Sequence, residues 1–281
     1  MRIIRTSGEM QQTALTLRAA GRRIGLVPTM GFLHAGHLSL VRLARARSDA
    51  VILSLFVNPT QFGPREDLGS YPRDFARDAA LCREADVDIL FAPEAAKMYA
   101  PDASVYVTEE HLAAGLCGAA RPGHFRGVCT VVAKLFNLCL PHVAVFGAKD
   151  AQQLRVIRRM TRDLNFPVEI VAGPTVREAD GLALSSRNSY LSADERRQAP
   201  VLRRALDEAE RLYRAGTRDA AALRNALQGI IAQAPAARID YIAVVDDETL
   251  APVQTLTKPA LVALAVYIGT TRLIDNTVLQ A

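Results

Sequence analysis

Short apolar runs alternate with amphipathic segments through the N-terminal part of the chain. The runs have the length and the β-branched content of strands buried on both faces, and the segments between them repeat apolar side chains at helical spacing. The runs lie at residues 23–28, 50–57, 87–93, 143–147 and 168–173, and the helical segments at 37–48, 73–85, 127–140 and 150–164. This alternation predicts an α/β domain with a doubly wound, parallel (Rossmann-like) sheet over residues 1–176.

The pattern changes after residue 176. Two helical segments, at about 193–215 and 219–234, precede two apolar runs at 239–246 and 260–269 that are typical of strands. We therefore expect a smaller C-terminal α+β domain over residues 177–281.

Composition narrows the class of protein. The chain of 281 residues is 50% hydrophobic and 22% charged, as in ordinary globular proteins. It has no apolar run of membrane-spanning length and no secretory signal, so we expect a cytoplasmic protein without a membrane partner. The four cysteines form no C-x-x-C pair and are expected to be free thiols. The net charge of +5 rests on arginines that alternate with acids at helical spacing, a pattern that does not indicate nucleic-acid binding.

The stretch PTMGFLHAGHLSL follows the first predicted strand and leads into a helix. A helix N-terminus at the carboxyl end of a parallel strand presents N–H groups and a positive dipole end, which favour an anion. Gly31, Ala35 and Gly36 let a phosphate or a purine approach the backbone, and His34 and His37 add hydrogen-bond donors. The turn predicts a nucleotide site, although packing or capping could explain two such histidines on their own.

HAGH resembles the HIGH signature of the nucleotidyltransferase superfamily, whose members attach or exchange AMP at the α-phosphorus of ATP. A second superfamily feature is a flexible segment of KMSKS type that closes over the triphosphate, and LALSSRN, Leu182–Asn188, resembles it. Ser185 and Ser186 can donate hydroxyl hydrogen bonds, and Arg187 can bind phosphate oxygens through two N–H groups. Without HAGH, the same segment could equally be an interdomain linker with a capping serine.

Five longer strings together are similar to the pantothenate synthetase (pantoate–β-alanine ligase) family. They are VPTMGFLHAGHLSL, SLFVNPTQFGPREDLGSYPRD, RPGHFRGVCTVVAKLFN, FGAKDAQQLRVIRRMTRDLNFPVEI and GLALSSRNSYLS, in this order. The resemblance runs to about Ser192 and is weaker beyond it. It implies that ATP drives the condensation of (R)-pantoate with β-alanine through a pantoyl adenylate, with release of AMP and pyrophosphate. Magnesium (Mg²⁺) would accompany ATP, with no residue assigned as its ligand. The assembly would be a homodimer.

The resemblance also implies roles for single residues. His37 would be the catalytic proton donor, while Gln61 and Gln153 would bind pantoate through neutral amides. Asn58, Tyr71 and His124 either line the site or buttress its loops. The residues that would bind ATP are Met30, Gly31, Phe32, Leu33, His34, Ala35, Gly36 and His37 in the turn, Gly147, Ala148, Lys149 and Asp150 after a strand, Val176, and Leu184, Ser185, Ser186 and Arg187 in the second segment.

Three of these positions can also be weighed on their own chemistry. Lys149 is one of four lysines and follows a predicted strand, which suits a phosphate contact, although it could be a surface lysine. Asp150 precedes a helix and is expected to cap it, a role compatible with ATP binding. Leu184 replaces the methionine usual in the family. Because the two side chains have similar volume, we expect a change in loop dynamics and no change in the reaction.

Other functions predict other features. One alternative is a HIGH-signature nucleotidyltransferase that forms a different adenylate, including a trimmed class I tRNA synthetase. The synthetase would need a tRNA-binding extension and a lysine in the second segment, where Arg187 is the only cation. A non-catalytic nucleotide- or RNA-binding protein would be expected to have lost phosphate donors, but His34, His37, Lys149 and Arg187 are all present.

Overall fold

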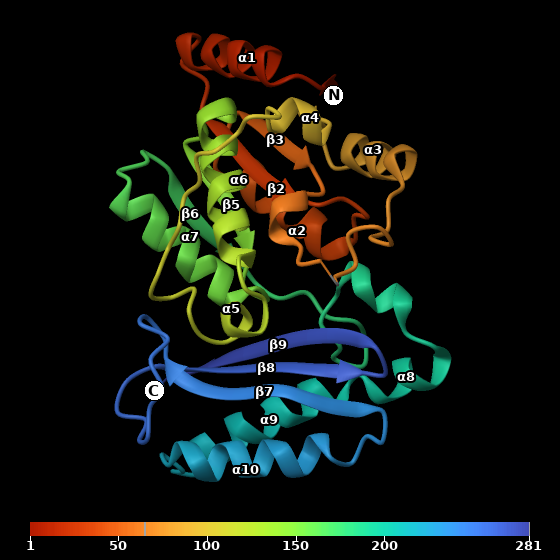
Figure 1. Ribbon diagram of the computed structural model, residues 1–281, viewed down its shortest axis with the longest axis vertical. Helices are drawn as coiled ribbons and strands as arrows, with labels where there is room; N and C mark the ends of the chain where they lie inside the picture. The colour runs from red at the N-terminus through yellow and green to blue at the C-terminus, as the bar shows by residue number, and fades with distance from the viewer. Residues whose placement is uncertain (65, 281) are drawn as a thin grey trace. The chain divides into compact units, whose positions relative to one another are not determined.

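The computed structural model describes residues 1–64 and 66–280 (Figure 1). The chain divides into two compact units, and each is described by itself. Unit 1 comprises Met1–Ala114, Gly118–Ala148 and Gln153–Pro174. Unit 2 comprises Gly115–Cys117, Lys149–Gln152 and the chain from Thr175 to the C-terminus.

Unit 1 is built on a six-stranded sheet in which every pair of neighbouring strands is parallel. The spatial order is β1-β4-β3-β2-β5-β6, so the chain changes direction across the sheet between β2 and β5. The doubly wound parallel sheet predicted from the apolar runs is confirmed. Its strands are β1 (Arg2–Ile4), β2 (Ile24–Thr29), β3 (Ala50–Leu55), β4 (Ile89–Phe91), β5 (Val143–Gly147) and β6 (Glu169–Gly173).

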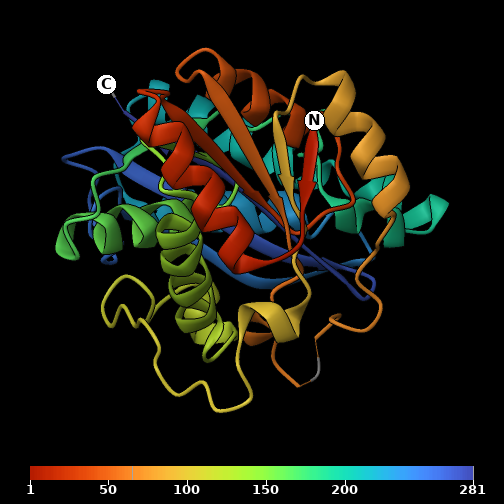
Figure 2. The ribbon, with the colours of Figure 1, turned by 90° about the horizontal axis from the view of Figure 1, so that it is seen from above.

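Helices cover both faces of this sheet (Figure 2). Helices α2 and α3 bury apolar residues against the face that carries Val27, Val51 and Val145, and α1 and α6 contact each other and β2. The helical elements up to β6 are α1 (Ser7–Ala19), α2 (Ala35–Arg45), the 3₁₀ turn η1 (Pro59–Gln61), α3 (Phe75–Glu84), α4 (Ala95–Met98), α5 (Cys117–Ala120), α6 (His124–Cys139) and α7 (Ala151–Asp163). None of the helices in the described part of the chain combines the length and apolarity needed to cross a membrane.

Unit 2 contains a three-stranded antiparallel sheet of order β7-β8-β9. Strand β8 is almost entirely buried, because one face packs on the core shared with α9 and α10 and the other, through Leu261 and Ala263, packs with Ala151. The elements are η2 (Ser186–Tyr190), α8 (Ala193–Gln198), α9 (Val201–Arg214), α10 (Ala220–Ile231), β7 (Ala237–Asp246), β8 (Ala260–Ile268) and β9 (Thr271–Leu279).

Two expectations for this region need correction. The single helix expected at 193–215 is two helices, α8 and α9, because Pro200 between them has no N–H to continue the helical hydrogen bonds. Strand β9 was not predicted at all. It alternates buried and partly buried residues, but the buried series contains Thr271 and Asp275 beside Leu273, so it lacks the apolar periodicity of a strand.

Candidate functional site

The histidine turn lies where the strand order of unit 1 reverses. Strand β2 ends at Thr29, the turn follows, and α2 begins at Ala35, close to the expected start. Strand β5, the neighbour of β2 across the reversal, ends at Gly147. In open parallel sheets, ligands bind beyond the carboxyl ends of the strands at such a reversal.

His34 and His37 are oriented by backbone groups of the same turn. His34 is the N-cap of α2, and its Nδ1 accepts from Gly36 N at 3.1 Å. Nδ1 of His37 accepts from His34 N at 3.3 Å, and the two rings lie 4.0 Å apart. A neutral imidazole that accepts at Nδ1 carries its proton on Nε2. Both neutral rings are therefore fixed as Nε2–H donors at the start of a helix.

A buried carboxylate shapes the turn before the histidines. Both oxygens of Asp78 in α3 accept backbone N–H groups, from Phe32 at 2.7 Å and from Leu33 at 2.8 Å. Gly31 and Phe32 have φ of +86° and +49°, a conformation in which glycine is unstrained and phenylalanine is not. Arg77 adds a bond to Leu33 O at 2.9 Å and stacks over the Phe32 ring. Helix α3 thus holds a left-handed backbone segment in place.

Gln61 is buried, although a loop residue of this type is usually exposed. Its Oε1 accepts from Asn58 Nδ2 at 3.1 Å, and its Nε2 donates to Met30 Sδ at 3.1 Å. Asn58, itself 1% exposed, is fixed by bonds to Gly127 O and from Tyr99 OH. The Gln61 amide therefore points its N–H group toward the histidine turn.

His124, Arg121 and Glu66 support the backbone of the Gln61 turn. His124 Nδ1 lies 2.9 Å from Gln61 O, so this nitrogen is the donor and the neutral ring accepts at Nε2, which faces Arg121 Nη1 at 3.1 Å. Arg121 pairs with both oxygens of Glu66, at 2.8 and 2.5 Å. Burial works to raise the pKa of Glu66, but the Arg121 guanidinium outweighs burial and lowers it. His124 thus buttresses the loop that carries Gln61.

Three other predicted residues lie in unit 1. Gln153 is half-buried in the first turn of α7, and Ala148 follows β5 with its N–H donating to Gly173 O at 2.8 Å. Tyr71 is buried and packs edge-on against Phe62.

In unit 2, residues 176–184 form a hydrogen-bonded hairpin, and the segment expected to be a flexible loop, Leu182–Asn188, begins in its second arm. Its arms pair through Leu184 N to Val176 O at 3.0 Å, an Arg177–Ala183 bridge, and Glu178 N to Leu182 O at 2.8 Å. The hairpin turns at Gly181, whose φ is +90°. The 3₁₀ turn η2 follows it, capped by the Ser185 hydroxyl, which accepts from Arg187 N at 3.3 Å. Ser186 is buried at the start of η2.

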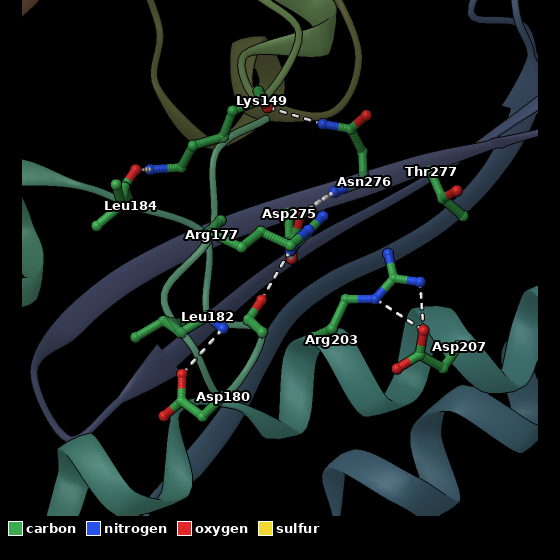
Figure 3. Close-up of polar contacts among 12 residues, drawn as sticks. Lys149, Arg177, Asp180, Leu182, Leu184, Arg203, Asp207, Asp275, Asn276 and Thr277 are labelled. Atoms are coloured by element: carbon green, nitrogen blue, oxygen red, sulfur yellow. Dashed lines mark hydrogen bonds and ion pairs between the residues drawn. The ribbon is translucent and has the colours of Figure 1, made fainter. Parts of the chain in front are cut away.

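Lys149 belongs to unit 2 and reaches this hairpin directly. Its Nζ donates to Leu184 O at 3.0 Å (Figure 3). Burial of the ammonium group lowers the pKa of Lys149, and the charges of Asp150 and Asp275 oppose this lowering. Asp150 is exposed and immediately precedes α7. Lys149 is therefore a partly buried lysine whose ammonium group is hydrogen-bonded to the hairpin.

The donor set suits magnesium that arrives with a nucleotide. Mg²⁺ on ATP is held mainly by phosphate oxygens and water, with one or two carboxylates. Within residues 1–64 and 66–280, no three His, Cys, Asp or Glu side chains are grouped to hold a metal ion by themselves.

The structure thus joins the predicted residues into two sets. His34, His37, Met30 and Gln61 are linked in unit 1, and Lys149, Val176, Leu184 and the serines are linked in unit 2. The sequence did not single out Asp78, Arg177 or Asp275. Each resembles an ordinary charged residue in the sequence, and only its partners in the fold distinguish it.

A doubly wound parallel sheet with a donor-rich turn at its strand reversal defines a nucleotide-binding α/β protein. The chain belongs to the pantoate-β-alanine ligase family, whose model matches residues 2–278. It is 56% identical over 281 residues to a pantothenate synthetase of Roseiflexus castenholzii, with 100% of both chains covered.

Solved structures agree with this assignment. The chain is similar to pantothenate synthetase from Thermus thermophilus, with a TM-score of 0.93, 49% identity and 99% of each chain covered. It is also similar to a pantoate-β-alanine ligase from Francisella tularensis, with a TM-score of 0.82 and 33% identity over 99% of this chain and 97% of that one. The latter was crystallised with a β,γ-ATP compound and β-alanine.

Proposed function

We propose that the protein condenses (R)-pantoate with β-alanine at the expense of ATP, by way of pantoyl adenylate, to give pantothenate, AMP and pyrophosphate. The family match over nearly the whole chain supports this proposal, as does the Francisella relative crystallised with an ATP compound and β-alanine. The single observation that carries it is the histidine turn, because it presents two imidazole donors at a helix N-terminus.

In the first step, a carboxylate oxygen of pantoate attacks the α-phosphorus of ATP. The bond from that phosphorus to the bridging oxygen breaks, and pyrophosphate leaves with the electron pair. A carboxylate is already nucleophilic at neutral pH, so this step needs positioning and charge stabilisation more than a base. His34 and His37 would supply Nε2–H donors to phosphate oxygens as their charge increases.

Pantoate would be bound by neutral amides. Because Asn58 occupies the Gln61 carbonyl oxygen, Gln61 offers an N–H group that suits the carboxylate or the hydroxyl of pantoate. Gln153 would provide the second amide. A neutral donor orients the carboxylate without the strong ground-state stabilisation that a full positive charge would cause.

Residues of unit 2 would act on the nucleotide. Lys149 and Arg187 would neutralise phosphate charge, Ser185 and Ser186 would donate hydroxyl bonds, and Val176 would contact adenine. Unit 1 would thus bind ATP and pantoate, and unit 2 would supply the segment that closes over ATP.

In the second step, the uncharged amine of β-alanine attacks the acyl carbon of pantoyl adenylate. The acyl–oxygen bond breaks, AMP leaves, and the amine releases its proton. Magnesium that arrives with ATP would screen phosphate charge, and the residues named above would bind and orient the substrates. A cytoplasmic homodimer completes the proposal, on the strength of the family resemblance.

Pantoate-dependent exchange of labelled pyrophosphate into ATP, with β-alanine absent, tests the proposed reaction. We expect robust exchange by the wild type and by His111→Ala, an exposed histidine of unit 1, and loss of exchange in His37→Ala. A wild type that binds ATP without exchanging would contradict the proposal, and other carboxylates would then be screened in the same assay.

A further inference from the structure

Strand β9 places a carboxylate inside unit 2. Asp275 is 3% exposed and stands at a position of β9 where the alternation calls for an apolar residue. A buried carboxylate is costly unless it is paired and hydrogen-bonded. The proposed reaction gives Asp275 no role of its own, so its partners must explain its place.

Both carboxylate oxygens of Asp275 are bound by Arg177. Nη1 and Nη2 of Arg177 bind the two carboxylate oxygens at 2.6 and 2.9 Å, and Asn276 N donates to one of them at 2.8 Å. The side chains of Arg177 and Asp275 are 22% and 2% exposed. A two-point pair of this kind fixes orientation as well as charge.

The ion pair continues into the hairpin. Arg177 Nη1 also donates to Gly181 O at 3.0 Å, and Arg177 itself forms the bridge to Ala183 on the opposite arm. Asp275 therefore anchors the base of the hairpin that carries Leu184 (Figure 3).

The same strand also holds Lys149. Asn276 Nδ2 donates to Lys149 O at 2.8 Å, and Lys149 Nζ donates to Leu184 O at 3.0 Å (Figure 3). The contacts form a closed ring within unit 2, from β9 through Arg177 and the hairpin to Lys149 and back to β9.

Four charges act on the Lys149 ammonium besides its burial. The carboxylates of Asp150 and Asp275 favour the charged amine, and the guanidinium groups of Arg187 and Arg177 disfavour it. Asp275 therefore supports the charge of Lys149 as well as its position.

We propose that Asp275 is a positioning residue for ATP binding. It holds Lys149 and the hairpin 176–184 in the arrangement that binds phosphate. The inference rests on the proposed function only in taking ATP as the ligand of Lys149 and of residues 184–187.

The test measures ATP affinity by calorimetry in the presence of magnesium, without pantoate, on the full chain from neutral to alkaline pH. Asp275→Asn and Arg177→Gln both break the ring. The matched control is Asp240→Asn, which breaks the partly buried Asp240–Arg272 pair of the same sheet without touching the hairpin. We expect the Kd for ATP to rise about tenfold in the first two variants and less than about threefold in the control.

The pH profile separates positioning from general damage. Asp275→Asn removes a charge that supports the Lys149 ammonium, so the alkaline loss of ATP affinity should move to lower pH. Arg177→Gln removes a charge that opposes it, so the loss should move to higher pH. In the exchange assay, the KM for ATP should rise more than kcat falls.

An equal effect of Asp240→Asn on the Kd, or alkaline shifts of the same sign in the two variants, would overturn the inference. Should Asp275→Asn fail to fold, Arg177→Lys replaces it, since it keeps the positive charge but loses the two-point pair with Asp275 and the bond to Gly181 O, and an unchanged Kd would overturn the inference. A wild type that binds ATP without pantoate-dependent exchange would overturn the proposed reaction instead, and the binding data would still decide the role of Asp275.

Discussion

The histidine turn of unit 1 and the hairpin of unit 2 are both donor-rich, but they are held in different ways. The turn is held by the capping bonds of its own histidines, His34 and His37, and by Asp78 and Arg77 of α3. The hairpin depends on side chains far away in sequence, since Arg177 and its partner Asp275 are 98 residues apart. The turn therefore combines local capping bonds with the support of one helix, whereas the hairpin depends on the ion pairs that anchor it.

The largest expected effect is on the exchange rate, when the donor His37 in the turn is replaced. His37→Ala should lower the exchange rate by about 10²- to 10⁴-fold, the usual contribution of a donor to developing charge. His37→Gln should retain more activity, because its amide nitrogen can replace Nε2–H. Initial exchange rates at saturating ATP measure both. A glutamine variant as inactive as the alanine variant would show that proton transfer, and not hydrogen-bond donation, is what His37 supplies.

The next largest effect is expected on stability, when the carboxylate that supports the turn is replaced. Asp78→Asn should lower the free energy of unfolding by about 3 kcal/mol, because one oxygen that accepts a backbone N–H becomes an NH₂ group. Urea unfolding followed by circular dichroism measures the loss. The exposed Asp102→Asn should change it by less than about 0.5 kcal/mol. Equal values for the two variants would mean that the turn does not need its carboxylate.

Glycine substitutions compare the two regions directly. Gly31 and Gly181 both have positive φ, so an alanine should cost about 1–2 kcal/mol at either position. At Gly31 the added Cβ would lie 3.2 Å from both Asp78 and Leu55, so these side chains would have to move by only a few tenths of an ångström. Gly181→Ala should cost more, because its Cβ would lie 2.9 Å from Cγ of Arg203, near the base of a side chain that Asp207 and Glu210 hold in place. Unfolding curves of the two variants give the order, and the reverse order would contradict this account of the hairpin.

A smaller effect concerns the hairpin at acid pH. The hydrogen bond from Arg196 lowers the pKa of Asp180 in the hairpin turn. Its stabilisation is therefore present at neutral pH and is lost as the pH falls below about 4 and through the lowered value. Because the pair is partly exposed, we expect less than about 1 kcal/mol. The difference in unfolding free energy between wild type and Asp180→Asn should disappear at acid pH, and a difference independent of pH would exclude the ion pair as its cause.

The smallest effect is expected at Leu184. Leu184→Met restores the usual residue of the family and conserves volume, so the exchange rate should change by about twofold or less. A larger change would mean that the side chain at this position controls closure of the hairpin over ATP.

The comparison also shows what the sequence could predict. Apolar runs and helical periodicity predicted five of the six strands of the parallel sheet, and the helix after the turn begins within two residues of the expected start. Strand β9 was missed because Asp275 breaks its apolar alternation, and the same residue anchors the hairpin. Asp275 therefore obscures the strand in the sequence pattern and also gives the strand its proposed role.

The sequence by itself determined the α/β alternation, the position of the histidine turn and the family, because these follow from neighbouring residues and from motifs read in order. Only the tertiary structure decided that Gln61 is buried and oriented by Asn58, that Asp78 accepts the N–H groups of the turn, and that Asp275 reaches Lys149 through Arg177 and Asn276. Each of the last two depends on residues distant in the chain, and the cost of burying a carboxylate is met only when the fold brings its donors together.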